Sequence, residues 1–348
     1  MQNYKSAGVD ISAGDAASKI AFAFAQKTFA SRKNLIGAPL SAAGGFAGLL
    51  DFGKFCVAQC CDTVGTKIDL AAKLNYFDEL GADLLAMVAD DAVCLGAEVV
   101  AVTNTFEIAK IDPIKIEKMM RSLSEICTAQ KVVISGGEIA EVGAKIQNAS
   151  WGADAIGIVA PEKIIDKKNV APGDAVISLH EKSFRCNGYS LIRKILAENW
   201  DENLARKCLR GSRVFHDAIL KLHGRFGEKP RVKISAIAHV TGGGIPGNLK
   251  RILPKNCGAV LENLFAPPDF FGEIQTLGKI PAREFYEVFN GGNGMLVVLP
   301  ESEVGAALEI LKSAKIDAQL AGEIVADKNE KIILRNFSAD DSGKLLEF

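Results

Sequence analysis

Residues 62–67 combine a side chain that can bind a metal ion with groups that can bind phosphate. The run DTVGTK begins at Asp62 and ends at Lys67, directly after a stretch of apolar residues. Its carboxylate can hold a divalent cation, and its backbone N–H groups and lysine can hold a phosphate group. The preceding glycines of a Walker A loop are missing. An ordinary polar turn is therefore the alternative interpretation of this run.

Two adjacent carboxylates, Asp90 and Asp91, lie inside an apolar stretch with helical spacing. An ionised group in such a helix is costly unless it is solvated, paired or bound to a metal ion. Because neighbours on a helix point in different directions, we expect one of the two on the surface. Asp91, which is followed by Ala92 and Val93, is the better candidate for burial and for a ligand role.

Glycine-rich runs elsewhere could also bring polar groups to a ligand. SGGEIAE (135–141) follows a predicted strand and could deliver Glu138 into a cleft, with a turn of solvated acids as the alternative. HVTGGG (239–244) precedes a predicted helix and offers open N–H groups to phosphate, with a flexible turn as the alternative. In RCNGYS, Asn187 is interpreted as a helix N-cap, with substrate contact as the alternative. FNGGNGM (289–295) is interpreted as a tight structural entry into a strand.

These motifs need elements to position them, and the apolar periodicity predicts alternating strands and helices in both halves of the chain. The fold class is therefore α/β or α+β. Residues 1–53 show weak periodicity, so we expect a long segment that is mobile or ordered by a ligand. The polar stretch 166–174 predicts a boundary between domains of residues 1–168 and 169–348. The predicted strands are 54–61, 99–105, 131–134, 155–160, 175–179, 234–238, 295–299, 318–324 and 331–334, and the predicted helices are 78–95, 113–130, 189–197, 214–222 and 302–314.

The composition argues against several classes of protein. At 348 residues the chain is long enough for two domains. Its formal net charge of -1, without blocks of like charge, gives no electrostatic footprint for nucleic acid. No apolar run approaches the ~20 residues of a membrane span, and we expect no secretory signal. The eight cysteines form no Cys-x-x-Cys pair, so we expect small buried side chains in a cytoplasmic protein rather than zinc ligands.

Taken together and in this order, the motifs resemble the aminoimidazole ribonucleotide synthetase family, also called phosphoribosylformylglycinamidine cyclo-ligases. The resemblance extends from residue 4 to about residue 335. No single short pattern produces it, which makes the combination specific. The matching residues are Tyr4-Lys5, Ala7 to Ile11, Gly44 to Phe46, Val64 to Lys67, Gly81 to Met87, Gly96 to Glu98, Gly136 to Glu138, Ala140-Glu141, Asn187 to Leu191, Ala236 to His239, Thr241 to Gly244, Phe289-Asn290 and Gly294-Met295.

The resemblance implies a two-domain fold and an ATP-dependent activity. The first domain is then an ATP-binding sheet with helices on one side that pairs with its twin in a homodimer, and the second is an α/β domain over the cleft. ATP, Mg²⁺ and a nucleotide substrate are the implied ligands. The implied reaction phosphorylates the formyl-amide oxygen of formylglycinamidine ribonucleotide, after which the amidine-side nitrogen closes the imidazole ring and phosphate leaves. In such phosphoryl transfer, positioning and charge neutralisation do most of the work.

The resemblance also implies roles for individual residues. The implied catalytic residues are Asp62, Lys67, Asp91 and Glu138, the implied metal ligands are Asp62, Asp91 and Glu138, and the implied nucleotide- or substrate-binding residues are Gly65, Thr66, Glu141, Asn187, His239, Thr241, Gly242, Gly243 and Gly244.

The chain departs from the family pattern at several positions. Asp90 stands where the family has Asn, and Asn104 stands where it has an acid, so a charge swap between those two is one interpretation. Arg185 stands where the family has His. An arginine cannot titrate in place of a histidine, but it can bind phosphate. Thr63 replaces a Gly, and Glu287 reverses the charge of an Arg.

Two other functions stay open on the sequence. The first is a divergent paralogue that has lost catalysis but still dimerises and binds a nucleotide or a partner. The second is another ATP-using enzyme of the same superfamily, such as a thiamine-phosphate kinase, a selenophosphate synthetase or a hydrogenase-maturation dehydratase. The NGYS and HVTGGG runs favour the purine branch, and the chain has no cysteine near its N-terminus for selenium chemistry.

Overall fold

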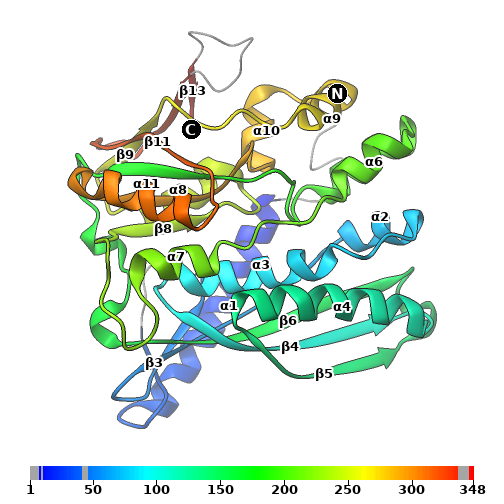
Figure 1. Ribbon diagram of the computed structural model, residues 1–348, viewed down its shortest axis with the longest axis horizontal. Coiled ribbons are helices and arrows are strands. Elements are labelled where there is room, and N and C mark those ends of the chain that lie inside the picture. Colours follow the sequence, from blue (N-terminus) through cyan, green and yellow to red (C-terminus); the bar gives the residue numbers. More distant parts are fainter. Residues whose placement is uncertain (1–7, 9–10, 41–45, 336–344) are drawn as a thin grey trace.

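Two β-sheets with their helices form the protein (Figure 1). The computed structural model describes residues 8, 11–40, 46–335 and 345–348. The strands of the first sheet end at Val159, and those of the second begin at Ala175. The predicted domain boundary at 168/169 falls between these two points. The family-matching residues Tyr4-Lys5, Ala7, Val9-Asp10 and Gly44-Gly45 lie outside the described part of the chain.

The first sheet has six strands in the order β1-β2-β3-β6-β4-β5. Only β4 and β5 are parallel, and the other neighbours are antiparallel. The sheet is therefore of the mixed α+β kind, in which one face can stay open to solvent. Its strands are β1 Ala38–Leu40, β2 Gly48–Asp51, β3 Cys56–Thr63, β4 Glu98–Ile108, β5 Val133–Glu141 and β6 Ala149–Val159.

Helices cover one face of this sheet. Helix α4 (Pro113–Gln130) begins and ends where the sequence predicts, because Asp112 caps its N-terminus and Lys131 leaves it in a left-handed conformation. Helix α3 (Leu80–Val93) packs on β3, β6 and α4, and the short helix α2 (Lys67–Leu74) precedes it. The side chains of the strands alternate, so those of the other face stay exposed.

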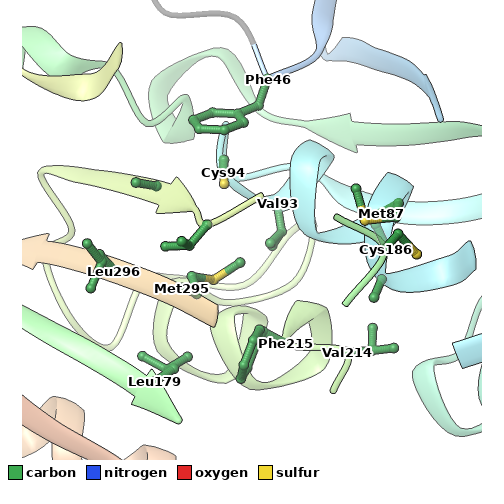
Figure 2. Close-up of a cluster of buried hydrophobic side chains, with 14 of the residues drawn as sticks. Phe46, Met87, Val93, Cys94, Leu179, Cys186, Val214, Phe215, Met295 and Leu296 are labelled. Carbon is green, nitrogen blue, oxygen red and sulfur yellow. The ribbon is translucent and has the colours of Figure 1, made fainter. Parts of the chain in front are cut away.

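Helix α3 lies between the first sheet and the second domain (Figure 1). Nearly every residue in it is buried, which means that it has no polar outer face. Apolar side chains from both halves of the chain meet there in one cluster (Figure 2). The labelled members of this cluster include Met87, Val93 and Cys94 from the first half and Leu179, Phe215, Met295 and Leu296 from the second.

The second sheet has seven strands in the order β13-β12-β9-β11-β7-β10-β8. All neighbours are antiparallel except β12 and β9. Its strands are β7 Ala175–His180, β8 Ala236–His239, β9 Cys257–Leu261, β10 Asn293–Leu299, β11 Ala318–Ala326, β12 Ile332–Arg335 and β13 Leu345–Glu347. The helices of this half are α5 Tyr189–Glu198, α6 Glu202–Cys208, α7 His216–His223, α8 Gly244–Ile252, α9 Asp269–Gly278, α10 Ala282–Val288 and α11 Val304–Ser313.

One helix was missed from the sequence, and one predicted strand boundary was wrong, while the expected mobility or ligand ordering of residues 1–53 stays a prediction. Residues 1–53 contain a 19-residue helix, α1 (Ile11–Phe29), besides β1 and β2. Six of its residues are alanine, so intrinsic helix propensity favours it without an apolar stripe for the periodicity to detect. The strand predicted to end before the glycines also continues to Glu141, which places Gly136-Gly137-Glu138 inside β5.

Several short elements were not predicted at all, including α2, α6, α9, α10, β9 and β13. Among the described residues, no helix combines the length and the apolar character that a membrane crossing requires. The eight cysteines are all free, and only Cys61 is exposed.

Candidate functional site

Three loops from both domains meet at one place, which we call the junction. It consists of residues 62–67, 186–190 and 241–244, together with Asp91. The Thr66 and Ser190 hydroxyls lie 3.5 Å apart. A Cβ atom at Gly242 would lie only 3.2 Å from the Asn187 amide nitrogen. The structure therefore brings together three of the motifs that the sequence singles out.

Glycine is required at two points of the junction. Gly188 has a φ of +79°, and a Cβ there would lie 2.2 Å from the Phe289 ring. Gly244 has a φ of +59°, and a Cβ there would overlap the Tyr286 carbonyl oxygen. Both are left-handed conformations that a side chain disfavours. The two glycines thus let the chain turn tightly into α5 and α8.

Asn187 does not cap helix α5, and the prediction that it does was wrong. Gly188 occupies the cap position and makes no side-chain cap. Because Gly188 supplies the left-handed turn at the cap position, the Asn187 side chain does not cap the helix and lies beside Gly242 instead. Its Oδ1 atom is buried and has no hydrogen-bond partner within the described chain. That oxygen can therefore accept a hydrogen bond from a ligand.

Two carboxylates at the junction have raised pKa values. Burial raises the pKa of Asp62 to about 6, against a backbone hydrogen bond from Thr63, and the charge of Asp91 raises it further. Burial raises the pKa of Asp91 to about 7, although Arg251 and Arg185 oppose the shift. Two desolvated acids that repel one another favour a bound cation.

The burial of Asp90 and Asp91 is the reverse of the prediction. Asp90 is completely buried, whereas the Asp91 side chain is 19% exposed. Because α3 is enclosed on both sides, a position that would be a surface on another helix meets the second domain here. Asp90 accepts hydrogen bonds from Arg185 at 2.7 Å and from the Phe215 backbone at 2.9 Å.

Arg185 is completely buried and does not reach a ligand at the junction. Its guanidinium group binds the Asp90 carboxylate at 2.7 Å and the Glu181 carboxylate at 2.9 Å. The charge of Asp90 is thus balanced by Arg185 rather than exchanged with Asn104. Asn104 instead accepts a hydrogen bond from the Trp151 indole at 3.1 Å.

His239 also lies behind the junction rather than in it. It is fully buried at the end of β8, with Nε2 2.7 Å from Arg185 Nη2 and Nδ1 2.7 Å from Asp91 Oδ1. Burial lowers the pKa of His239 well below its usual value, and the Arg185 charge lowers it further. His239 is therefore neutral and contacts Asp91, which is the group nearer to solvent. Thr241, Gly242 and Gly243 remain at least partly exposed.

Lys67 is fastened inside the protein, which corrects the prediction that it binds phosphate. Its ammonium group lies 2.6 Å from the Asp83 carboxylate, and both side chains are fully buried. It also donates to the backbone oxygens of Arg210 at 2.8 Å and Arg185 at 3.3 Å. A lysine ammonium has three donors, so these contacts use all of them. The lysine fastens α2 and α3 to the second domain.

Glu138 and Glu141 lie away from Asp62 and Asp91. In the register of the first sheet, Glu138 pairs with the exposed Thr105, whereas Asp62 is in line with the buried Asn104. Alternate residues of a strand point to opposite faces, so Glu138 points to the open face and Asp62 to the helix-covered face. Glu141 accepts a hydrogen bond from the Ile111 backbone. In the described part of the chain, no three acids, cysteines or histidines gather into a metal site.

Sequence reasoning missed two buried acids of this region, Asp83 and Glu181. For Asp83 a signal existed, because Asp83 and Asp90 are seven residues apart and share one face of a helix. Glu181 follows strand β7 and has no such signal. Its carboxylate accepts from the Ser183 hydroxyl at 2.9 Å and from Arg185, a pairing that only the tertiary structure reveals.

Comparison with known proteins finds the same family in both halves. Residues 44–159 match the family model described as the AIR synthase related protein N-terminal domain, and residues 171–335 match the corresponding C-terminal domain. The chain is 32% identical over 345 residues to the phosphoribosylformylglycinamidine cyclo-ligase of Thermodesulfovibrio yellowstonii, covering 95% of this chain and 99% of that protein. It is 33% identical over 340 residues to the enzyme of that name from Geotalea uraniireducens, covering 92% and 94%.

Solved structures share the fold at lower identity. The hydrogenase maturation protein HypE in complex with ATP aligns with a TM-score of 0.63 at 15% identity, over 83% of this chain and 84% of that one. PurL of T. maritima complexed with ADP aligns with a TM-score of 0.58 at 15% identity, over 89% of this chain and 46% of that one. The solved structures show only the fold at this identity. The two matched domains and the relatives of nearly the same length show the family. The chain belongs to the aminoimidazole ribonucleotide (AIR) synthetase family.

Proposed function

We propose that the protein is an ATP-dependent ligase that closes the imidazole ring of formylglycinamidine ribonucleotide to give aminoimidazole ribonucleotide in purine biosynthesis. The observation that carries the proposal is the junction, where two desolvated acids lie beside glycine loops from both domains. Curated relatives of nearly the same length bear the name of this activity. Structures of the same fold are complexed with ATP or ADP, which supports ATP as the phosphate donor.

The loops of the junction supply groups for binding phosphate and substrate. Helix α8 begins at Gly244, and the residues before it carry no side chain that would shield their N–H groups. A helix N-terminus attracts anions through its dipole and its free N–H groups. Gly65 and Thr66 add a second turn of this kind from the first domain. Asn187 offers its unpartnered Oδ1 to a donor on the substrate.

Asp62 and Asp91 fit a magnesium ion. Both are carboxylates with pKa values raised by burial, and each ionises more readily if a divalent cation binds. Bound there, Mg²⁺ would neutralise charge on the phosphate groups. Glu138 does not fit as a third ligand within one chain, because it lies on the opposite face of the sheet.

The open face of the first sheet is the proposed homodimer interface. Ile156 on β6 is 43% exposed and Val133 on β5 is 61% exposed, and the same face presents Glu138. An apolar sheet face of this kind is suited to a symmetric contact with a second copy. We expect Ile156→Lys to convert a dimer into a monomer in sedimentation, while Leu277→Lys on α9, a comparably exposed residue, leaves the dimer intact. A wild-type monomer at micromolar concentration would contradict the proposal. The cytoplasmic location stays a prediction.

The activity is tested with purified protein, ATP, magnesium and formylglycinamidine ribonucleotide. We expect ring-closed product, ADP and phosphate in equal amounts, and no turnover when any one component is left out. Two glycine variants provide a matched pair at the junction. Gly242→Ala places a methyl group against the Asn187 side-chain amide, whereas Gly247→Ala, in helix α8 just after this loop, points into open space. The first should raise KM or lower kcat, and the second should leave both near wild type.

The proposal fails if folded protein at high concentration yields no ring-closed product. A paralogue that has lost catalysis would still bind ATP under these conditions, as titration calorimetry would show. If Gly242→Ala and Gly247→Ala behaved alike, the junction would not be the binding site.

A further inference from the structure

Contacts of 2.7–2.9 Å hold both terminal nitrogens of the Arg185 guanidinium group, whereas its buried Nε atom has no hydrogen-bond partner among the described residues. Nη1 donates to Glu181 and to the Arg213 carbonyl oxygen, both at 2.9 Å. Nη2 donates to Asp90 at 2.7 Å and faces His239 Nε2 at 2.7 Å. The side chain is completely buried, so water does not compete for these donors. The guanidinium plane is therefore fixed, and one of its N–H groups points at the histidine.

The direction of the hydrogen bonds follows from the chemistry of the two side chains. A guanidinium group can only donate, so His239 Nε2 must be the acceptor and carries no proton. The imidazole proton is then on Nδ1, which donates to Asp91 Oδ1 at 2.7 Å. A protonated imidazole would set N–H against N–H at the Arg185 contact. The hydrogen bonds are thus donated in one direction only, from Arg185 to His239 and from His239 to Asp91.

We propose that Arg185 is a positioning residue that locks His239 in the tautomer with the proton on Nδ1, so that His239 orients the Asp91 carboxylate at the junction. The link to turnover rests on the proposed function, whereas the tautomer does not. The resemblance implies that the family has His in place of Arg185 and Asn in place of Asp90. Here a charged pair occupies both positions, and the two departures belong together because each charge is buried against the other.

Asp90 and Glu181, the two acids around Arg185, cannot replace it as the donor to His239 and so cannot orient Asp91 through that histidine. Asp90 has its second oxygen on the Phe215 backbone at 2.9 Å, and Glu181 accepts from Ser183 and from the Arg213 backbone at 3.1 Å. These contacts hold the acids in place and leave their negative charge to be balanced by Arg185. If Arg185 is removed, two acids lose their partner, and the imidazole of His239 loses the donor that fixes its tautomer.

The direct test is the protonation pattern of the histidine ring. The chain has four histidines, so ¹⁵N-labelled imidazoles can be resolved by NMR, with His239 assigned from a His239→Gln sample. We expect the wild-type ring to carry its proton on Nδ1. We expect Arg185→Lys to give a mixture of tautomers, because a single ammonium group cannot reach Asp90, Glu181 and His239 together. A wild-type ring protonated on Nε2, or an unchanged ring in Arg185→Lys, would overturn the proposal.

Arg225→Lys is the matched control. Arg225 also bridges two acids of different domains, Glu98 and Asp217, but it does not contact His239. We expect it to leave the His239 tautomer and the kinetics near wild type. Arg185→Lys should lower kcat at least tenfold with little change in KM, since the substrate is still bound but Asp91 is misdirected. Loss of kcat in both variants alike would point to general destabilisation and overturn the assignment. If the wild type itself has no ring-closing activity, the proposed function fails and the NMR result still decides this inference.

A second measurement covers variants that fold poorly. Asp90→Asn alone leaves Arg185 short of a partner and should lower Tm by about 5 °C or more. Adding Arg185→His to Asp90→Asn creates the pair that the resemblance implies for the family and should recover more than half of that loss. If the double variant loses as much Tm as the single variants Asp90→Asn and Arg185→His lose together, Asp90 and Arg185 do not depend on one another, and the proposal is wrong.

Discussion

Helix α3 carries two fully buried acids seven residues apart, and a comparison of the two shows how similar ion pairs can serve different ends. Asp83 is paired with Lys67 at 2.6 Å, and Asp90 is paired with Arg185 at 2.7 Å. Each acid also accepts a backbone N–H from the second domain. Both pairs therefore join the two halves of the molecule.

The two cations differ in what they do with their remaining donors. The ammonium group of Lys67 donates its remaining hydrogen bonds to the main-chain oxygens of Arg185 and Arg210. The guanidinium of Arg185 continues to His239 and from there to Asp91. A lysine is a point charge with flexible donors, whereas an arginine is a rigid fork that can orient a neighbour. The first pair fastens the fold, and the second both fastens it and aims a carboxylate.

Removing either cation should give the largest effect on stability. Lys67→Met and Arg185→Met each leave a buried acid without its partner, and we expect each to lower the free energy of unfolding by about 3–5 kcal/mol. Urea unfolding followed by circular dichroism measures this. The comparison predicts similar losses of stability but different activities, with turnover per folded molecule retained in Lys67→Met and reduced in Arg185→Met.

The same pair of variants can contradict the comparison. If Lys67→Met were stable but inactive, the lysine would act on phosphate, as the family resemblance implies, and the comparison with Arg185 would fail. If Arg185→Met retained full turnover per folded molecule, Arg185 would be only a fastening residue like Lys67.

Replacing the acids gives the next largest effect. Asp91→Asn removes a charge that the fold tolerates poorly, so Tm should stay the same or rise. We expect it to reduce turnover by about 2–4 kcal/mol of transition-state stabilisation. Asp83→Asn should do the opposite, lowering Tm while turnover per folded molecule stays near normal. Thermal melts and steady-state kinetics on the two variants decide, and a destabilised but fully active Asp91→Asn protein would refute the role of Asp91.

Much of the scaffold could be predicted from the sequence, because periodicity reports the face that each element buries. Helix α4 is the best case, since its cap, its first-turn proline and its apolar spacing all agree. Helix α3 was found, but its two acids were assigned the wrong way round, because an amphipathic pattern cannot show that a second domain covers the outer face. Helix α1 was missed because alanine stabilises a helix without producing a stripe.

The candidate site was predicted in part. The motifs at Gly65, Asn187 and Gly242 do meet, and the resemblance of the chain to its family is confirmed by both family models. What could not be predicted is pairing across the domains. Nothing near Asp90 in the sequence points to Arg185, which is 95 residues away. The effect of a departure from the family pattern can therefore be inferred only when the residue that compensates for it is known.

The last and smallest expected effect concerns a contact between the halves that involves no ion pair. His216, the first residue of α7, is fully buried, and its Nε2 accepts the Val99 backbone N–H of β4 at 2.9 Å. Burial lowers the pKa of His216 to about 4, with a smaller effect from Arg225. The unfolded chain binds a proton near pH 6.5, whereas the folded chain does not. The contribution of His216 to stability is therefore fully present above pH 6.5 and is lost as the pH falls toward 4. At about 1.4 kcal/mol per pKa unit, we expect a loss of about 2–3 kcal/mol over this range.

His216→Gln keeps an acceptor for Val99 but cannot titrate, so its unfolding free energy should fall less between pH 6.5 and 4.5 than that of the wild type. His180→Gln, at a partly exposed histidine whose pKa burial lowers less strongly, should depart from the wild-type profile less than His216→Gln does. If His216→Gln and wild type lost stability in parallel, the acid sensitivity of the interface would come from its ion pairs and not from His216.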